Sequence, residues 1–259
     1  LSVGNKSIFS NKLKNEIKDT INNKNQVMLF LNRRGYANFV SCRNCSYVFS
    51  CNNCDISLTY HKKTNTGRCH YCGYEEQIPT ECPECKSKYI KPFGVGTQRI
   101  EEEIKSIFTD IRVLRLDKDT TSKKGSFEEI LNKFKNREAD VLIGTQMLSK
   151  GLDFDNVTLV GILSADMILK FPDFKSAETT FQLVTQVAGR AGRSYKDGKV
   201  ILQTYDTNHY AIRHAINYDF KGFYEDEIKI RKLFNYAPFN SMISVVVSGK
   251  DENIVKSNI

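Results

Sequence analysis

Eight cysteines arranged in four CxxC pairs constrain this chain more than any other feature of its sequence. In chain order, the pairs are Cys42/Cys45, Cys51/Cys54, Cys69/Cys72 and Cys82/Cys85. A CxxC turn directs two thiolates at one point, and two such turns form a tetrahedral four-sulfur site for zinc. The four turns therefore predict two zinc ions. Disulfides are the alternative, but the rest of the chain lacks cysteine and has the pattern of a cytosolic α/β domain.

The spacing of the pairs favours one arrangement of the two sites. Consecutive pairs are separated by 5, 14 and 9 residues. The 14-residue gap is close to zinc-ribbon spacing and long enough for a hairpin, which predicts one site from Cys51, Cys54, Cys69 and Cys72. The other site then consists of Cys42, Cys45, Cys82 and Cys85, with the first site nested inside it. His61 and His70 could also act as ligands, but eight thiols already fill eight positions.

The bulk properties fit a water-soluble chain with one full-sized core. The 259 residues are 40% hydrophobic and 26% charged, and no apolar run approaches transmembrane length. No signal peptide opens the chain, and reduced metal-binding cysteines favour the cytoplasm. The net charge of +8 suggests a polyanionic partner, provided that other features agree. Because the chain begins with Leu and stops without an evident end, we expect a fragment of a longer protein.

Short apolar runs alternate with amphipathic segments along the chain, which is typical of a parallel sheet with helices on both faces. The expected strands are 27–31, 111–116, 141–143, 157–163 and 199–204. The expected helices are 8–21, a helix starting at 97, 126–134, 179–188 and a helical stretch over 209–234.

This pattern divides the chain into three parts. Residues 1–40 and 92–208 form a discontinuous α/β lobe, and residues 41–91 form an inserted zinc module whose folding energy comes from metal. Residues 209–259 form a helical connector and the start of a truncated C-terminal α/β domain, with a strand expected at Met242–Val247.

Two further segments carry chemistry. Residues 144–154, GTQMLSKGLDF, form a glycine-bracketed polar loop after an expected strand, which can present backbone N–H groups and a hydroxyl to phosphates. Residues 186–193, QVAGRAGR, place Arg190 and Arg193 on a turn that ends a helix. Both guanidinium groups can reach one polyphosphate, as arginine fingers do during phosphoryl transfer.

These two segments resemble motif V and motif VI in the second RecA-like lobe of superfamily 2 helicases. With a double-zinc insertion in that lobe, the chain is similar to the PriA family of bacterial replication-restart helicases. Other segments that carry the resemblance are 29–36, 69–73, 94–99 and 166–178.

The resemblance implies a 3′→5′ DNA helicase, monomeric, that acts in replication restart and primosome assembly at stalled forks. Its implied partners are forked DNA, primosome proteins and single-strand-binding proteins, and its implied cofactors are two Zn²⁺, ATP and Mg²⁺. It implies a catalytic set of Arg190, Arg193 and Gln186, and a nucleotide-binding set of Gly151, Asp153 and Gly189. The implied DNA-binding residues are Thr145, Gln146, Arg33 and Arg34.

The sequence departs from a complete helicase in one respect. It contains no GxxxxGK[ST] motif and no DExH motif, and the segment Gly94–Thr97 lacks the lysine that would reach phosphates. In the family these motifs belong to a first lobe that precedes this segment. We therefore expect the chain alone neither to hydrolyse ATP nor to unwind DNA. The alternative function is a non-catalytic, zinc-dependent module that binds DNA or protein.

Overall fold

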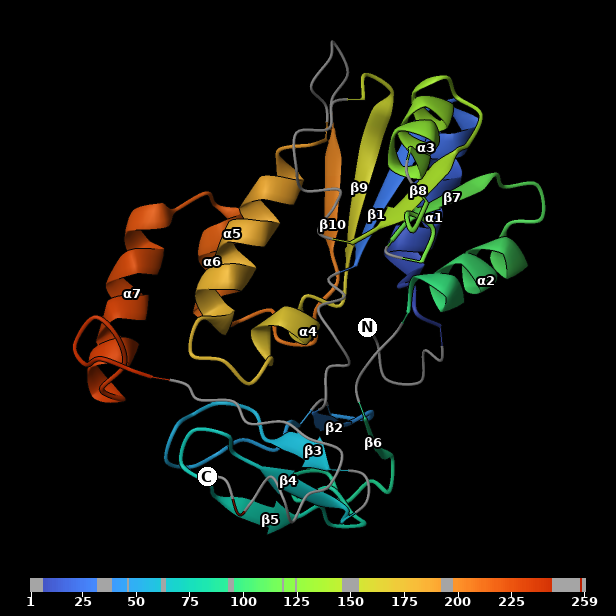
Figure 1. Cartoon of the computed structure of the whole chain (residues 1–259). Coiled ribbons are helices and arrows are strands. Elements are labelled where there is room, and N and C mark those ends of the chain that lie inside the picture. Colours follow the sequence, from blue (N-terminus) through green and yellow to red (C-terminus); the bar gives the residue numbers. More distant parts are fainter. Residues whose placement is uncertain are drawn as a thin grey trace.

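The chain consists of an α/β lobe and a smaller cysteine-rich module (Figure 1). The structure, a computed structural model, describes residues 7–31, 39–45, 47–61, 64–92, 96–117, 119–123, 125–145, 154–191, 198–243 and 257.

A five-stranded, fully parallel sheet forms the centre of the lobe, in the order β10-β9-β1-β8-β7. The strands are β1 (Gln26–Leu31), β7 (Val113–Leu116), β8 (Val141–Gly144), β9 (Val157–Leu163) and β10 (Lys199–Leu202). All six residues of the central β1 are buried, which explains the continuous apolar run from Val27 to Leu31. The RecA-like α/β sheet expected from the sequence is therefore confirmed.

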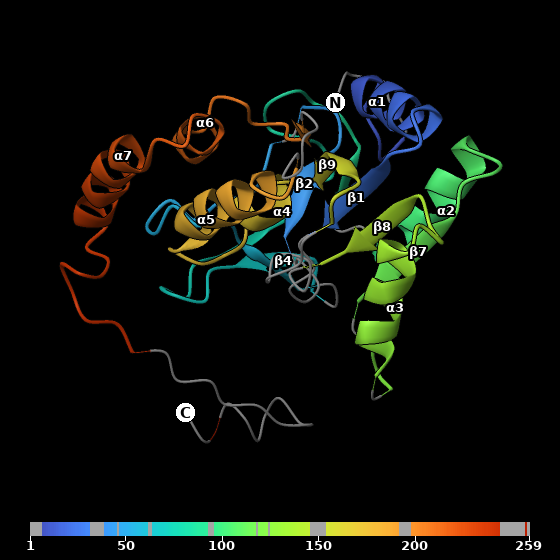
Figure 2. The same cartoon turned by 90° about the horizontal axis from the view of Figure 1, so that it is seen from above.

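Helices cover both faces of this sheet (Figure 2). One face carries α1 (Asn11–Asn22) and α2 (Thr97–Ile107), and the other carries α3 (Ser126–Lys135), α5 (Ser176–Ala188) and α6 (Tyr210–Ile216). The short α4 (Asp166–Leu169) follows β9, and α7 (Phe220–Leu233) packs on α6. Residues of β1 alternate between two apolar cores, with Phe30 in one and Leu29 in the other.

The first helix shows how local sequence fixes one of these faces. Ser10 is its N-cap, and the Ser10 hydroxyl accepts a hydrogen bond from the Leu13 N–H at 3.2 Å. Leu13 and Ile17 lie one turn apart and are fully buried. A Cβ atom at Gly161 of β9 would lie 2.7 Å from Leu29 and 3.3 Å from Leu13, so glycine at this position permits the close approach of α1.

The structure tests two expectations for the C-terminal region in part. The helical stretch 209–234 is broken into α6 and α7, because Tyr218 adopts a positive φ of 53° between them. Of the strand expected at Met242–Val247, Met242 and Ile243 are exposed and non-helical but outside any strand, and 244–247 lie outside the described residues. The expected boundaries of the three parts stay predictions. Within the described ranges, no helix combines the length and the apolar character needed to cross a membrane.

The cysteine-rich module lies beyond the carboxyl ends of the parallel strands (Figure 1). Antiparallel strands β2 (Val40–Cys42) and β6 (Ile90–Pro92) pair where the chain enters and leaves it. A small sheet follows inside the module, formed by β3 (Thr59–His61), β4 (Thr66–Arg68) and β5 (Glu75–Gln77). The small apolar cluster around Leu58 and Ile78 includes two of the cysteines, so the module has little core apart from its metal ligands.

Candidate zinc centres and sheet-edge sites

The four CxxC turns share one backbone hydrogen bond. In each turn the N–H of the first cysteine donates to the carbonyl five residues later, at 2.7–2.9 Å. These bonds are Cys42 to Tyr47, Cys51 to Ile56, Cys69 to Tyr74 and Cys82 to Ser87. In three turns the residue four positions on has a positive φ and donates back to the first cysteine, namely Asp55, Gly73 and Lys86. The repeated backbone geometry therefore directs the sulfurs, whatever residues lie between the cysteines.

The turns bring together the two nested sets that the spacing predicted. In each set the four sulfur atoms lie within 4.8 Å of one another; the sets are Cys42, Cys45, Cys82, Cys85 and Cys51, Cys54, Cys69, Cys72. The shortest Sγ–Sγ separations are 3.5 Å. A zinc tetrahedron with Zn–S bonds of about 2.3 Å has edges of about 3.8 Å, whereas a disulfide bond measures about 2.05 Å. The sulfurs are therefore spaced for two zinc ions, and all eight cysteines are free of disulfides.

In each set, an asparagine side chain donates a hydrogen bond to the last cysteine of the set. Asn44 directs its side-chain N–H at the sulfur of Cys85, at 3.5 Å, and Asn53 directs its own at Cys72, at 3.8 Å. Each asparagine immediately precedes the second cysteine of its turn. This repeated contact orients the sulfur from outside the ligand shell, as second-shell groups do at metal sites.

The same N–H groups favour thiolate at these sulfurs. Hydrogen bonds from Asn44 and from the Ser87 N–H lower the pKa of Cys85 to about 6. The Tyr74 N–H, together with neighbouring sulfurs and Asn53, lowers the pKa of Cys72 to about 6. Burial raises the pKa of Cys45 to about 12, so its ionisation calls for a cation.

The inner set of cysteines contacts the lobe through aromatic side chains. The Tyr236 hydroxyl donates to the carbonyl oxygen of Cys54 at 2.5 Å, and the Phe174 N–H donates to the Tyr71 hydroxyl at 3.4 Å. The ring of Tyr236 stacks on Phe174 at 5.1 Å and meets Tyr71 edge-on at 6.1 Å. Arg231 of α7 lies 5.2 Å from the Phe174 ring and forms a 2.7 Å ion pair with Glu178 of α5. This aromatic contact joins the inner set to α5 and α7.

A cavity of about 360 Å³ separates the outer set from the lobe. Cys42, Arg43 and Tyr47 of the module line one side, and Asp166 and Lys170 of the lobe line the other. Burial raises the pKa of Asp166 and lowers the pKa of Arg43. The two cysteine sets thus differ in surroundings, because the inner set is hydrogen-bonded to the lobe through Tyr236 and Phe174, whereas the outer set faces this larger cavity.

Thr145 lies at the carboxyl edge of the sheet, on the side that faces the module. It follows the last residue of β8, Gly144, and it is half-buried. Across the ladder, Gly144 pairs with Leu116 of β7, so Thr145 and Asp117 leave the sheet on adjacent strands.

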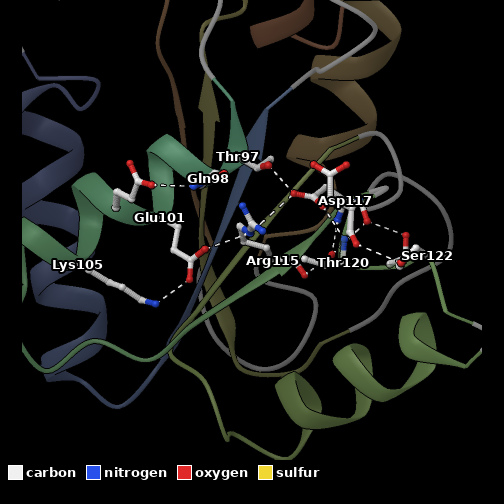
Figure 3. Close-up of polar contacts among 11 residues, drawn as sticks. Thr97, Gln98, Glu101, Lys105, Arg115, Asp117, Thr120 and Ser122 are labelled. Carbon is white, nitrogen blue, oxygen red and sulfur yellow. Dashed lines mark hydrogen bonds and ion pairs between the residues drawn. The ribbon is translucent and has the colours of Figure 1, made fainter.

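Asp117 is the centre of a polar network at this edge (Figure 3). Its carboxylate is 2% exposed; one oxygen accepts the Thr97 hydroxyl at 2.5 Å, and the other accepts the Asp119 and Thr120 N–H groups at 3.0 Å. Burial raises the pKa of this carboxyl, but hydrogen bonds from Thr97 and Thr120, with the charge of Arg115, outweigh burial and hold the pKa below its ordinary value. Sequence reasoning missed this network. The available signal was an aspartate directly after a strand, followed by an Asp-Thr-Thr turn.

Gln186, Gly189 and Arg190 lie at the end of α5. That helix follows β9 and leads back to the start of β10, so its end lies at the amino edge of the sheet (Figure 1). Gln186 and Gly189 are exposed, and Arg190 is half-buried. Thr145 and Arg190 therefore lie at opposite edges of the sheet.

Several predicted site residues lie outside the described residues: Arg33, Arg34, Gln146, Gly151, Asp153 and Arg193. The two histidines considered as ligands, His61 and His70, face each other with ring centroids 5.6 Å apart. Neither histidine belongs to the two ligand sets of the described residues, which consist of cysteines alone.

Comparison with known proteins places these features in a family. A family model described as the PriA DNA helicase Cys-rich region domain matches residues 51–77, and the helicase conserved C-terminal domain matches 88–195. The chain is 52% identical over 248 residues to the replication restart protein PriA of Bacillus subtilis, covering 96% of this chain and 31% of that protein. It is 45% identical over 263 residues to the PriA of Synechocystis, covering 100% and 32%.

The chain thus spans about a third of the length of these relatives. Among solved structures it is similar to domain 2 of the Mss116p DEAD-box helicase bound to an RNA duplex, with 12% identity and a TM-score of 0.41 over 85% of this chain and 61% of that one. That score is too low to support a functional argument. On the strength of its relatives and of both matching domain models, the chain belongs to the PriA family of replication restart proteins, and holds the cysteine-rich region and the conserved C-terminal helicase domain.

Proposed function

We propose that this chain supplies the second RecA-like lobe and the double-zinc module of an ATP-driven 3′→5′ DNA helicase that restarts replication at stalled forks. In this proposal the amino edge of the sheet faces ATP and Mg²⁺ held by a first lobe, and the carboxyl edge faces DNA. The protein works in the cytoplasm, where thiols stay reduced, with primosome and single-strand-binding proteins as partners.

The observation that carries the proposal is the location of Arg190 and Thr145 at opposite edges of one sheet. A translocating enzyme must bind nucleotide and DNA at once, without competition between the two polyanions. Arg190 at the amino edge and Thr145 at the carboxyl edge meet this requirement. Arg190 and Arg193 would contact the γ-phosphate, and Gln186 would organise them or the attacking water.

Gly189 supports the assignment of the amino edge to nucleotide. Its φ is −66°, which any residue adopts, and a Cβ atom there would meet only ordinary contacts at 3.6 Å. Within the described chain, neither backbone conformation nor space requires glycine at this exposed position. The remaining reason for glycine at this position is the close approach of a ligand to the backbone. Gly151 and Asp153 would complete the contact with the nucleotide.

At the carboxyl edge, DNA would contact Thr145 and Gln146, with Arg33 and Arg34 following β1 in the sequence. Hydroxyl, amide and guanidinium groups all donate to phosphate oxygens, and the net charge of +8 favours a polyanion. The zinc module beyond this edge would extend the same surface.

The zinc ions would be held by the two cysteine sets and would supply structural rigidity. Ligation by four thiolates leaves no open coordination position, so these sites hold the fold and take no part in hydrolysis.

The test is mutation of the arginines in the full-length protein that contains this chain. Arg190→Ala or Arg193→Ala should lower DNA-stimulated ATP hydrolysis by about 10³-fold or more, as loss of an arginine finger does. DNA affinity measured without nucleotide should stay unchanged. An ATPase rate within twofold of the wild type would refute the finger assignment.

The second candidate is a non-catalytic zinc-dependent module that binds DNA or protein. The absence of a GxxxxGK[ST] motif in these 259 residues favours it for the chain in isolation. The two candidates separate in one assay, because only the first predicts that ATP hydrolysis by the full-length protein depends on Arg190.

A further inference from the structure

The segment Gly94–Thr97 and its helix α2 have no role in the function proposed above. Yet the chain returns from the zinc module through this segment, and Thr97, the first residue of α2, is fully buried. Its hydroxyl does not cap its own helix. It crosses to Asp117, twenty residues later in the sequence, at the end of β7 (Figure 3).

Asp117 also orders the loop that follows it. The Thr120 hydroxyl accepts the Asp117 N–H at 3.0 Å, and the Thr121 hydroxyl donates to the Asp117 carbonyl at 2.7 Å. Together with the two N–H groups on its carboxylate, these bonds tie residues 119–121 to Asp117. A buried, ionised carboxylate with three donors is a strong constraint, since bonds to charged groups are about twice as strong as neutral ones.

The constrained loop is next to the proposed DNA contact. Leu116 pairs with Gly144, so the loop leaves the sheet beside Thr145. The Thr97–Asp117 bond therefore links the return from the zinc module to the edge that would face DNA. A second contact supports it, because Arg115 lies 3.1 Å from Glu101 of α2.

We propose that Asp117, through its bond to Thr97, is a positioning residue that holds the carboxyl edge in its DNA-binding conformation. The proposal rests on the assignment of that edge to DNA. Asp117 itself would not contact DNA, because a buried carboxylate repels phosphate.

Removal of the Asp117 charge is a test of this role, because a charge effect and a positioning effect change DNA affinity in opposite directions. If Asp117 acted only through its charge, Asp117→Asn would remove a negative group near a polyanion and tighten DNA binding. If it positions the loop, the same change weakens binding, because the amide cannot accept on both atoms.

The experiment measures affinity of the full chain for fluorescent single-stranded and forked DNA by anisotropy. Thr97→Val and Asp117→Asn should each weaken binding by about fivefold, the size of couplings carried by such networks. Thr97→Ser keeps the hydroxyl and should stay within twofold. The matched control is Thr180→Val, which removes an equally buried hydroxyl from α5, at 2.8 Å from a backbone carbonyl.

Two further readouts keep the outcomes distinct. The salt dependence of affinity should be unchanged in Thr97→Val, because no phosphate contact is lost. Hydrogen exchange of the amides in 117–122 should be faster in Thr97→Val than in the wild type, while the β8 and β9 amides keep their protection. A general loss of stability would instead speed exchange in all of these segments.

Tighter binding by Asp117→Asn, or unchanged affinity and exchange in Thr97→Val, would overturn the positioning role. If the wild-type chain and the full-length protein both fail to bind DNA, the function assigned to this edge is wrong instead.

Discussion

In the lobe, all six residues of β1 are buried between two layers of helices, whereas in the module every residue of the strands β3 and β5 is half-buried or exposed. The lobe has two apolar cores, and the module has one small cluster that includes cysteines. The lobe is thus stabilised by apolar burial and the module by its metal ligands. One chain therefore contains two regions that should respond differently to the same perturbation.

Removal of zinc is the strongest test of this difference. Structural zinc binding contributes about 10–16 kcal/mol to folding at neutral pH, so a strong chelator should unfold the module. The lobe should keep its parallel sheet. Limited proteolysis checks this, with new cleavage sites expected within 41–91 and none within β1, β8 or β9.

Single cysteine variants sharpen the test, because each should affect one site. Elemental analysis should find about two zinc ions per wild-type chain and about one in either Cys42→Ser or Cys51→Ser. A chain with one zinc in the wild type, or loss of both ions in each variant, would contradict two independent nested sites.

A cavity introduced into the core of the lobe by mutation should destabilise the lobe and leave the zinc sites of the module intact. Phe134 is fully buried, and its ring packs edge-on against Phe154 at 5.0 Å. Phe134→Ala should lower the free energy of unfolding by about 3–5 kcal/mol, measured by urea denaturation. Zinc content should stay at two ions. Loss of zinc in this variant would show that the module depends on the lobe for its metal sites.

The contact between the regions predicts a smaller effect. Tyr236→Phe removes the hydroxyl that donates to the Cys54 carbonyl, and a typical hydrogen bond contributes about 1 kcal/mol. Zinc release to a chromophoric chelator should become about fivefold faster for one of the two ions. Tyr89→Phe is the control, since Tyr89 is 67% exposed and its carbonyl accepts the N–H of Arg43, the neighbour of Cys42 in the outer set. Equal release from both sites in Tyr236→Phe would mean that the inner set is not coupled to α7.

Much of this fold could be predicted because its signals are local. Continuous apolar runs identified the strands, and the 14-residue gap between Cys54 and Cys69 identified the nested pairing. The Tyr236–Cys54 contact could not be found in this way, since 182 residues separate the two and nothing in either segment specifies the other. The opposite locations of Thr145 and Arg190 were accessible in principle. A crossover helix runs antiparallel to its strands, so the end of α5 had to lie at the amino edge.

The central strand runs from the amino edge of the sheet to the carboxyl edge, beyond which the zinc module lies. Six extended residues span about 20 Å, and β1 is held on both sides by β8 and β9. A strand bonded along its whole length does not stretch or bend easily. Because hydrogen bonds from Tyr236 to Cys54 and from Phe174 to Tyr71 fix the inner cysteine set to the lobe, the module should move with the lobe as one body. Because displacement increases with distance from the axis of rotation, a slight turn of the lobe about a bound nucleotide would carry the cysteine-rich tip through a larger arc.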